Sequence, residues 1–386
     1  MKQIIIIGGG IGGLCTALAL QQKGLTAQVY ETVNEIKAVG AGIILAPNAM
    51  NVLARLGLAD RAKALGMELE HLELTDAAGK KLMPVPNKEE TIRDFGFAMI
   101  ALLRSSLYDL LLKALPPNTV LTNKHFERYE ENADGVTAHF TDGTQATGSV
   151  LIGADGVRSA VRRQLLPQVQ LRYSGQTSYR GVANMALQGA QAHIAREAWG
   201  SPIRLGFVPI GFGQTYWYST VQTPAGGTDV DKASAKRQLL AWAQEFDGIS
   251  RAIIENTPDQ SVIRTDMYDL PPLPTWHSGR VVLLGDAAHA TTPNLGQGGC
   301  QAIEDAFVIA DQLNRLSAQQ APQHAFAEYE RIRKPKAELV VARSRQLGSM
   351  VHLRYGWQRA LRNGLLRRIP ASMGKKQSQD ILALNF

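Results

Sequence analysis

The sequence predicts an α/β protein: a parallel-sheet domain, a mostly antiparallel sheet inserted into it, and a helical C-terminal segment. Apolar runs that meet glycine, at residues 4–7, 150–153 and 280–284, are typical of buried parallel strands. Between the second and third runs, polar and apolar residues alternate, which indicates antiparallel strands with one solvated face. Beyond residue 336, apolar residues recur at helical spacing, so this end is expected to be helical.

Composition excludes several classes of protein. The chain has 386 residues, 45% of them hydrophobic and 19% charged, which suffices for a large core. From residue 331 onward, 13 Lys and Arg face two acidic residues, although the whole chain carries only +7. The basic excess therefore belongs to the C-terminal segment, and no groove for nucleic acid is expected.

The N-terminus and the cysteines indicate a cytoplasmic protein without a metal site. The apolar run at residues 4–7 is too short for a signal peptide, and no run is long enough to span a membrane. Cys15 and Cys300 are far apart and have no metal-ligand spacing, so we expect packing residues and neither a disulfide framework nor a bound metal.

The first element, residues 4–7, leads into a glycine triplet. Gly8, Gly10 and Gly13 follow it in the pattern G-x-G-x-x-G, before an apolar helix that ends near Lys23 and a second strand that ends at Glu31. The first glycine permits the tight turn, the second lets a pyrophosphate approach the backbone, and the third lets helix and strand pack closely. An acid at the end of the second strand can bind ribose hydroxyls. This order predicts a Rossmann-like dinucleotide site but does not distinguish FAD from NAD.

Two later turns complete the pattern. Asp155 and Gly156 follow the run at 150–153, and Gly285 and Asp286 follow the run at 280–284, before the glycine-rich stretch 296–299. With these three ordered motifs the chain closely resembles the group A flavoprotein monooxygenases, the p-hydroxybenzoate hydroxylase fold family, over nearly its whole length. Through residues 290–293 and 296–299 it looks most like the urate hydroxylase, zeaxanthin epoxidase and alkylquinolone hydroxylase branch.

The resemblance implies that FAD is the cofactor. Asp286 would accept a hydrogen bond from the ribityl chain, the loop 296–299 would approach the flavin ring, Arg104 would reach the diphosphate, and Asp155 would serve FAD and NAD(P)H. Surface or helix-capping roles for Arg104 and Asp155 remain open, and His289 is expected to belong to a structural turn. The residues expected to contact FAD are Gly8, Gly10, Gly12, Gly13, Glu31, Ile44, Arg104, Phe126, Asp155, Asp286, Gly296, Gln297, Gly298 and Gly299.

The same resemblance implies a division into domains. Residues 1–66, 84–173 and 272–335 would form the FAD-binding domain, residues 67–83 and 174–271 the substrate domain, and residues 336–386 a C-terminal helical segment. Strands are expected at 177–182, 203–209 and 214–220, and residues 67–83 are expected to add a strand pair to the substrate sheet.

Arg204 and Tyr216 match positions that line the active site in the urate hydroxylase branch, and we assign them catalytic roles. A cation there would favour an ionised, electron-rich substrate; a sheet-surface arginine and a packing tyrosine are the alternatives. The sequence departs from the urate hydroxylases at Asn294, where they carry an aspartate. The loss of that charge weakens the case for urate as substrate.

The function implied is hydroxylation of a small aromatic or heteroaromatic molecule through a flavin hydroperoxide, with NADH or NADPH as reductant. No second glycine triplet exists for the nicotinamide cofactor, so it would dock transiently. The alternatives are an alkene epoxidase, a halogenase, disfavoured because the chain has no Trp-x-Trp, and a non-catalytic FAD-binding protein. A monomer or a homodimer is expected.

The basic C-terminal segment allows two interpretations. Trp357, Leu361, Leu365 and Leu366 recur at roughly helical spacing beside Arg354, Arg362 and Arg368. The simpler interpretation is a solvated helix face, and the alternative is a weak contact with an anionic membrane surface or partner.

Overall fold

The computed structural model describes residues 3–34, 41–317 and 320–386. Its nucleotide-binding half is built on a six-stranded sheet in the order β17-β18-β11-β1-β2-β7, parallel except for β17. The three predicted apolar runs are its central strands. The strands are β1 (Ile4–Ile7), β2 (Ala27–Tyr30), β7 (Val120–Leu121), β11 (Val150–Gly153), β17 (His277–Ser278) and β18 (Val281–Leu283).

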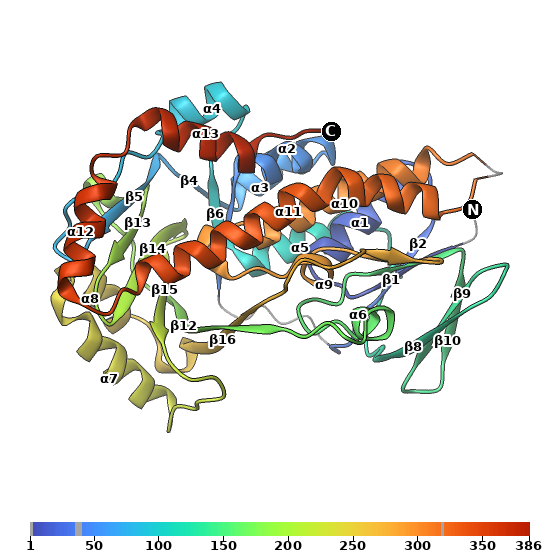
Figure 1. Ribbon diagram of the computed structural model, residues 1–386, viewed down its shortest axis with the longest axis horizontal. Helices are drawn as coiled ribbons and strands as arrows, with labels where there is room; N and C mark the ends of the chain where they lie inside the picture. Colours follow the sequence, from blue (N-terminus) through green and yellow to red (C-terminus); the bar gives the residue numbers. More distant parts are fainter. Residues whose placement is uncertain (1–2, 35–40, 318–319) are drawn as a thin grey trace.

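Three helices pack against one another on one side of this sheet (Figure 1). They are α1 (Ile11–Gln22), α10 (Gly298–Asn314) and α11 (Gln323–Val351). Cys15 of α1 and Cys300 of α10 are free and fully buried in this core, as expected of packing residues. The remaining helices of this half are α2 (Pro47–Arg55), α3 (Ala59–Ala64), α4 (Lys88–Phe95), α5 (Arg104–Ala114), α6 (Ala160–Leu165) and α9 (Asp286–His289).

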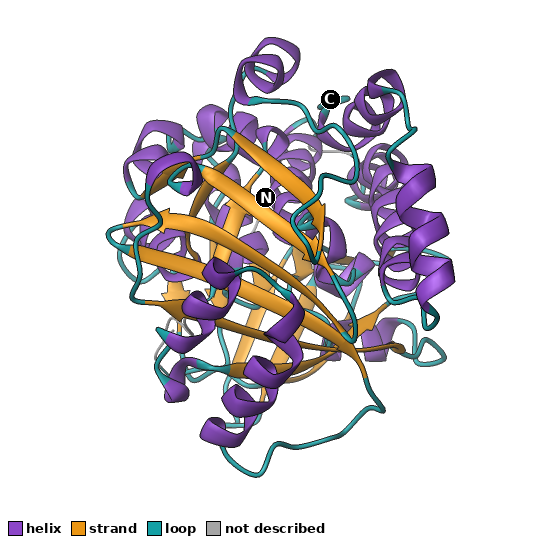
Figure 2. Cartoon of the chain, turned by 90° about the vertical axis from the view of Figure 1, so that its left-hand side faces the viewer, coloured by secondary structure: helices purple, strands orange, loops and turns teal. Residues whose placement is uncertain are grey.

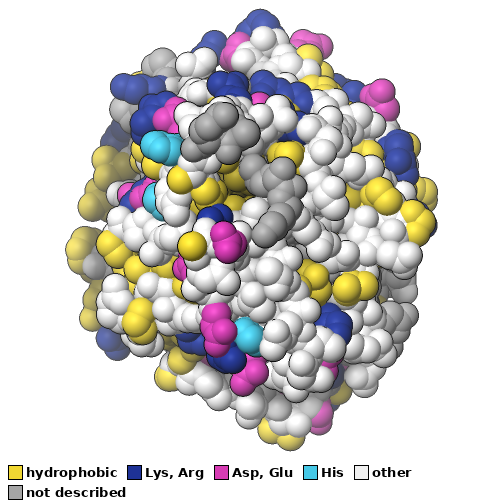
Figure 3. Space-filling model, turned by 90° about the vertical axis from the view of Figure 1, so that its right-hand side faces the viewer, with side chains coloured by type: hydrophobic (Ala, Val, Ile, Leu, Met, Phe, Trp, Pro, Cys, Tyr) yellow, Lys and Arg dark blue, Asp and Glu magenta, His cyan; other side chains and the backbone are white. Residues whose placement is uncertain are grey.

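A three-stranded antiparallel sheet closes the far end of the nucleotide-binding half. It consists of β8 (Phe126–Glu131), β9 (Val136–Phe140) and β10 (Gln145–Gly148). Positive and negative side chains are intermixed on the face of the molecule at this end (Figure 3), as in the ion pairs Lys124–Asp142 and Arg128–Glu130 of this sheet.

The inserted half is a second six-stranded sheet, in the order β16-β12-β15-β14-β13-β5. Helices α7 (Lys232–Trp242) and α8 (Gly248–Glu255) pack against one face of it, and helices can be seen in front of the long strands in Figure 2. The predicted strands at 177–182, 203–209 and 214–220 lie within β12, β14 and β15. The strands are β5 (His71–Asp76), β12 (Arg172–Ala183), β13 (Ile194–Trp199), β14 (Ile203–Gly211), β15 (Gln214–Gln222) and β16 (Ile263–Asp269).

The strand pair predicted for residues 67–83 is wrong in one half. β5 joins the substrate sheet, parallel to β13, but β4 (Gly66–Glu68) pairs with β6 (Ile100–Leu103) in a small sheet that also holds β3 (Gly42–Leu45). The separation follows from packing, because a Cβ atom at Gly66 would lie 2.4 Å from the carbonyl oxygen of Ala101. The glycine therefore lets β4 approach β6.

The C-terminal helices run along the molecule, cover one end of it and then return along its side (Figure 1). α11 contains 29 residues with Pro335 inside it, so the domain boundary expected after residue 335 lies within one helix. α12 (Gly356–Leu366) lies beside the substrate sheet, and α13 (Ala371–Leu382) lies against α2 (Figure 1). Within the described part of the chain, every helix is too short or too polar to cross a bilayer.

Candidate active site

The predicted glycine turn after β1 has the geometry of a phosphate site. Gly8 has φ +103°, and a Cβ atom at Gly13 would lie 2.0 Å from the carbonyl oxygen of Gly8, so neither position accepts a side chain. At Gly10 the space around such a Cβ is open, and the residue lines a cavity. Gly10 caps α1 without a side chain, so the positive end of the helix faces that cavity.

Glu31 lies beside this turn. Its carboxylate accepts hydrogen bonds from the N–H groups of Gly9 at 2.6 Å and Val33 at 3.0 Å. These two contacts hold the Glu31 carboxylate at the end of β2, where it would meet the ribose hydroxyls of a bound dinucleotide. The position agrees with the sequence prediction, although Glu31 does not line the cavity itself.

In the second turn, the carboxylate of Asp155 is bound by the start of the helix that follows it. Asp155 accepts hydrogen bonds from Ser159 Oγ at 2.5 Å and from the N–H groups of Ala160 and Val161 at 2.7 and 3.1 Å. Burial raises the pKa of this carboxyl, and these hydrogen bonds oppose the effect. Asp155 therefore organises the start of α6, as the capping alternative expected, while Gly156 beside it lines the cavity.

The third turn brings an acid and a helix end to the cavity. Gly285 has φ +60°, and Asp286 after it lines the cavity. Asp286 is exposed to that space but surrounded by protein, and burial raises the pKa of its carboxyl against the nearby charges of His289 and Arg104. Gly298 and Gly299 open the 17-residue helix α10 at the same cavity. A Cβ atom at Gly299 would lie 3.0 Å from Ile43 Cδ1.

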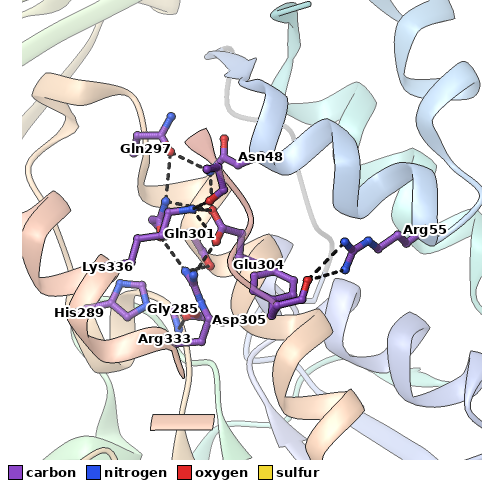
Figure 4. Close-up of polar contacts among 12 residues, drawn as sticks. Asn48, Arg55, Gly285, His289, Gln297, Gln301, Glu304, Asp305, Arg333 and Lys336 are labelled. Carbon is purple, nitrogen blue, oxygen red and sulfur yellow. Dashed lines mark hydrogen bonds and ion pairs between the residues drawn. The ribbon is translucent and has the colours of Figure 1, made fainter. Parts of the chain in front are cut away.

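A buried polar network fixes this third turn from behind (Figure 4). Asp305 accepts hydrogen bonds from Gly285 N at 3.0 Å, His289 Nε2 at 2.5 Å and Arg333 Nε at 2.7 Å. Burial opposes ionisation, but the charges of His289 and Arg333 lower the pKa of Asp305 to about 2. Asp305 therefore stays ionised and holds the turn, and His289 has the structural place expected of it.

Glu304, the neighbour of Asp305, extends the network to the glycine-rich loop at residues 296–299. It pairs with Lys336 Nζ at 2.8 Å and accepts a hydrogen bond from Asn48 Nδ2 at 2.6 Å. The same Asn48 nitrogen donates to Gln297 Oε1 at 3.0 Å. Gln297 thus points into the network and is absent from the cavity lining, whereas the glycines that follow it line the cavity.

The other wall of the cavity is the substrate sheet. Arg204 of β14 is fully buried, and its guanidinium lies 3.5 Å from Glu197 Oε1 on β13. Its Nε and Nη1 atoms have no hydrogen-bond partner among the described residues. Buried donors without partners are uncommon in proteins and favour a ligand-binding role. Tyr216 of β15 lines the same cavity, and burial raises the pKa of its phenol.

Sequence reasoning missed Glu197 and Tyr218. Tyr218 pairs in register with Gly206, which pairs with Glu197, so the three residues form one row across β15, β14 and β13. A Cβ atom at Gly206 would lie 2.3 Å from the Tyr218 ring; the glycine leaves room for the ring to cross β14. The phenol then donates to Glu197 Oε2 at 2.5 Å, and Trp199 Nε1 donates to Oε1 at 2.7 Å.

The structure brings most of the predicted residues to one cavity and leaves a few outside it. Phe126 lies on β8, half-buried against the core of the nucleotide-binding half, and does not line the cavity. Gly8, Gly13, Glu31, Asp155 and Gln297 shape the turns around it. The predicted residues that line it directly are Gly10, Gly12, Ile44, Arg104, Arg204, Tyr216, Asp286, Gly296, Gly298 and Gly299.

The residues that line the cavity fit an FAD molecule. Arg104 is exposed there and has no carboxylate within 4 Å among the described residues, which suits a diphosphate. The start of α1 has no side-chain cap and offers a positive helix end to the pyrophosphate, for which there is open space at Gly10. The start of α10 offers a second positive helix end to the ring. In the described ranges 3–34, 41–317 and 320–386, no group of three His, Cys, Asp or Glu is placed to hold a metal ion.

Comparison with known proteins gives the same assignment. A family model described as FAD binding domain matches residues 1–344. The chain is 39% identical to the Aurachin C monooxygenase/isomerase of Stigmatella aurantiaca over 90% of this chain and 89% of that one. It is 32% identical to the 2-heptyl-3-hydroxy-4(1H)-quinolone synthase of Pseudomonas aeruginosa over 98% and 97%. The structure of Klebsiella pneumoniae HpxO with FAD and uric acid matches with a TM-score of 0.89, 30% identity, and 98% and 96% coverage.

Proposed function

This chain belongs to the FAD binding domain family and is a group A flavin monooxygenase, and we propose that its substrate is a neutral heteroaromatic molecule that carries both a carbonyl group and an N–H group. The observation that supports this substrate class is a pair of unpartnered polar groups in the cavity, the donors of Arg204 and an acceptor on Asn294.

FAD, when bound, would activate dioxygen: one oxygen atom goes to the substrate, the other leaves as water, and NADH or NADPH supplies the two electrons. The chain holds the cofactor with the glycine turn at Gly8–Gly13, Arg104, Asp286 and the start of α10. Apolar side chains from several elements exclude water from the reacting face, which strengthens every electrostatic contact inside. They include Ile43, Ile44, Leu72, Val208 and Leu295.

Glu197 decides the charge of the substrate. The sequence predicted that Arg204 would favour an ionised substrate, but Glu197 lies within ion-pair distance of it. Trp199 and Tyr218 both donate hydrogen bonds to Glu197 and hold its carboxylate beside Arg204. The pair then has no net charge, and an anionic ring beside Arg204 would also meet the carboxylate. We infer that the substrate is neutral when it binds.

Asn294 adds an acceptor. Its Nδ2 donates to the carbonyl oxygen of Ser344 at 2.9 Å and to Thr292 Oγ1 at 3.0 Å. Because the Ser344 carbonyl can only accept, this contact fixes the orientation of the amide. Oδ1 is then left buried without a partner among the described residues. A substrate N–H would satisfy it, and a substrate carbonyl would satisfy Arg204, as a 4-quinolone or a pyridone could do.

Tyr216 is the second proposed catalytic residue. Burial raises the pKa of its phenol, so it stays protonated at neutral pH and can donate a hydrogen bond. A donated hydrogen bond would hold the ring that receives oxygen. We also propose that the protein works in the cytoplasm, where nicotinamide cofactors are available.

The test uses the FAD-loaded protein with NADH or NADPH and three probes: a 4-quinolone, its N-methyl derivative and urate. The quinolone should accelerate NAD(P)H oxidation and gain one oxygen atom, measured by mass spectrometry, while the N-methyl compound and urate should do so at least about tenfold less well. A preference for urate, which is an anion at neutral pH, would contradict the proposal that the substrate is neutral. Epoxide formation from an alkene would favour the epoxidase alternative, and FAD binding without any NAD(P)H oxidation would favour a non-catalytic protein.

Glu197→Gln sharpens the test of charge. Glutamine can still accept from Trp199, but it leaves the Arg204 charge uncompensated. The ratio of kcat/KM for urate to that for the quinolone should rise about tenfold. Arg237→Gln, at a position outside the cavity lining, is the control and should leave the ratio unchanged. An unchanged ratio in Glu197→Gln would contradict the proposed role of the ion pair.

A further inference from the structure

Helix α12 lies next to the substrate sheet (Figure 1), and several of its apolar side chains are exposed to solvent. Trp357, Leu361 and Leu365 are 67%, 58% and 57% exposed, and they lie four residues apart, so they share one face of the helix. Tyr355, just before the helix, is 53% exposed. We call these four residues the apolar stripe. Large side chains grouped in this way are typical of an interaction site.

The opposite face of α12 is anchored, which fixes the stripe outward. Arg362 and Leu366 are buried. The guanidinium of Arg362 donates to the carbonyl oxygens of Met350 and Val351 at 3.1 and 2.7 Å and lies 4.8 Å from the centre of the Trp199 ring. The helix cannot turn its stripe inward without leaving this buried guanidinium unpaired.

The chain segment that carries the stripe is rich in basic residues. Residues 354–376 contain seven Lys and Arg and no Asp or Glu. Arg367 and Lys375 pair with Asp76 and Asp94, and Arg362 is buried. Arg354, Arg359, Arg368 and Lys376 have no carboxylate within 4 Å among the described residues. The opposite end of the molecule mixes both charges (Figure 3), so this excess of basic residues does not extend to that end.

We propose that the apolar stripe and these four basic residues form a docking surface for a membrane that contains anionic lipids. Trp and Leu on one face of a basic helix suit the boundary between headgroups and acyl chains, and the arginines suit the phosphates above it. A second copy of the chain is a poorer occupant, because a twofold contact through α12 would bring the same uncompensated arginines together.

The docking surface lies close to the substrate cavity. His352, between α11 and α12, contacts Thr220 Oγ1 at 2.8 Å, and Thr220 lines the cavity. Trp199, beneath Arg362, follows Glu197 on the same strand. A molecule dissolved in the bilayer would therefore meet the enzyme at its substrate end. The docking itself does not depend on which substrate is used.

The experiment measures co-sedimentation of the FAD-loaded protein with phosphatidylcholine vesicles, with and without phosphatidylserine. The protein should bind the anionic vesicles, less so as salt rises, and the emission of Trp357 should shift to the blue. The triple variant Trp357→Ser/Leu361→Ser/Leu365→Ser should lose at least about tenfold in affinity. The matched control Phe212→Ser/Val230→Ser removes two apolar side chains that are 78% and 94% exposed elsewhere, and it should bind as the wild type does.

A second pair of variants isolates the charge. Arg354→Gln and Arg368→Gln should each lower affinity for anionic vesicles about fivefold, whereas Arg331→Gln, an exposed arginine of α11, should not. Equal binding of the wild type and the triple variant, or no binding by the wild type, would overturn the proposal. A wild-type dimer that the triple variant converts to monomer would overturn it too. NAD(P)H oxidation with a water-soluble substrate should be unchanged in every variant, which separates this test from that of the proposed function.

Discussion

The two walls of the cavity are built by different means. The wall proposed to hold the flavin is made of backbone: Gly8, Gly156 and Gly285 lie in three turns at strand ends, and the shape of these turns needs only neighbours within a few residues. The substrate wall is made of side chains from separate strands, such as Glu197 and Tyr218, which meet only because the register aligns them. A backbone site tolerates few substitutions and binds one cofactor, whereas a side-chain site can change its ligand without a change of fold.

The largest effect is expected where the cofactor wall is held from behind. Arg333→Met would leave Glu304 and Asp305 buried with too little positive charge and should lower the free energy of unfolding by about 3–5 kcal/mol. Urea denaturation measures it. Arg331→Met, which removes an exposed ion pair with Glu328, should cost less than about 1 kcal/mol. Similar costs for the two variants would contradict the role given to the network.

The next test separates cofactor from fold. Gly10→Val places a side chain in open space, so the protein should fold but bind FAD at least about 100-fold more weakly, roughly 3 kcal/mol. Titration with FAD measures the affinity, and circular dichroism checks the fold. Gly364→Val, which also meets no atom within 4 Å, should bind FAD normally. Undiminished FAD affinity in Gly10→Val would place the pyrophosphate elsewhere.

A third test concerns pH at the substrate wall. Burial, together with the charge of Arg204, lowers the pKa of His352 from 6.5 to about 4. The folded state favours the neutral imidazole, whereas the unfolded chain binds a proton below pH 6.5. The contribution of His352 to the free energy of unfolding is therefore complete above pH 6.5 and is lost as the pH falls toward 4. Its full size is about 3 kcal/mol. His352→Gln cannot titrate, and its stability relative to the wild type should therefore rise over that interval. Parallel stability curves would contradict the assignment.

The smallest effect tests the row of residues across the sheet. Gly206→Ala should push the Tyr218 ring away from Glu197, and Tyr218→Phe should remove only the hydroxyl. Both should lower kcat/KM about tenfold, roughly 1.4 kcal/mol, with FAD affinity unchanged. Steady-state kinetics and FAD titration provide the two measurements. A loss of FAD binding in either variant would show that the two walls are not separable.

Sequence alone predicted the backbone turns of the cofactor wall better than the side chains of the substrate wall, because the turns depend on local sequence and the side chains depend on strand register. The glycine turns at residues 8, 156 and 285 depend on short-range geometry that one stretch of chain reveals. Tyr218 could have been found from its two-residue spacing to Tyr216 on one strand face. Glu197 could not, because its place depends on how β13 aligns with β14. Phe126, expected to contact FAD, lies half-buried against the core and outside the cavity lining, and its contact with FAD stays a prediction.

Helix α11 is one continuous helix of 29 residues, about 44 Å long, and it contacts the segments that carry both walls from outside the cavity. Arg333 and Lys336 bind Asp305 and Glu304 behind the third turn, while Ser344 binds Thr292 and Asn294 further along the helix. A displacement at one end of α11 is therefore transmitted to its other end, because no loop interrupts the helix. An occupant that fits the substrate pocket tightly should thus raise the affinity for FAD, and bound FAD should raise the affinity of the pocket for that occupant by the same factor.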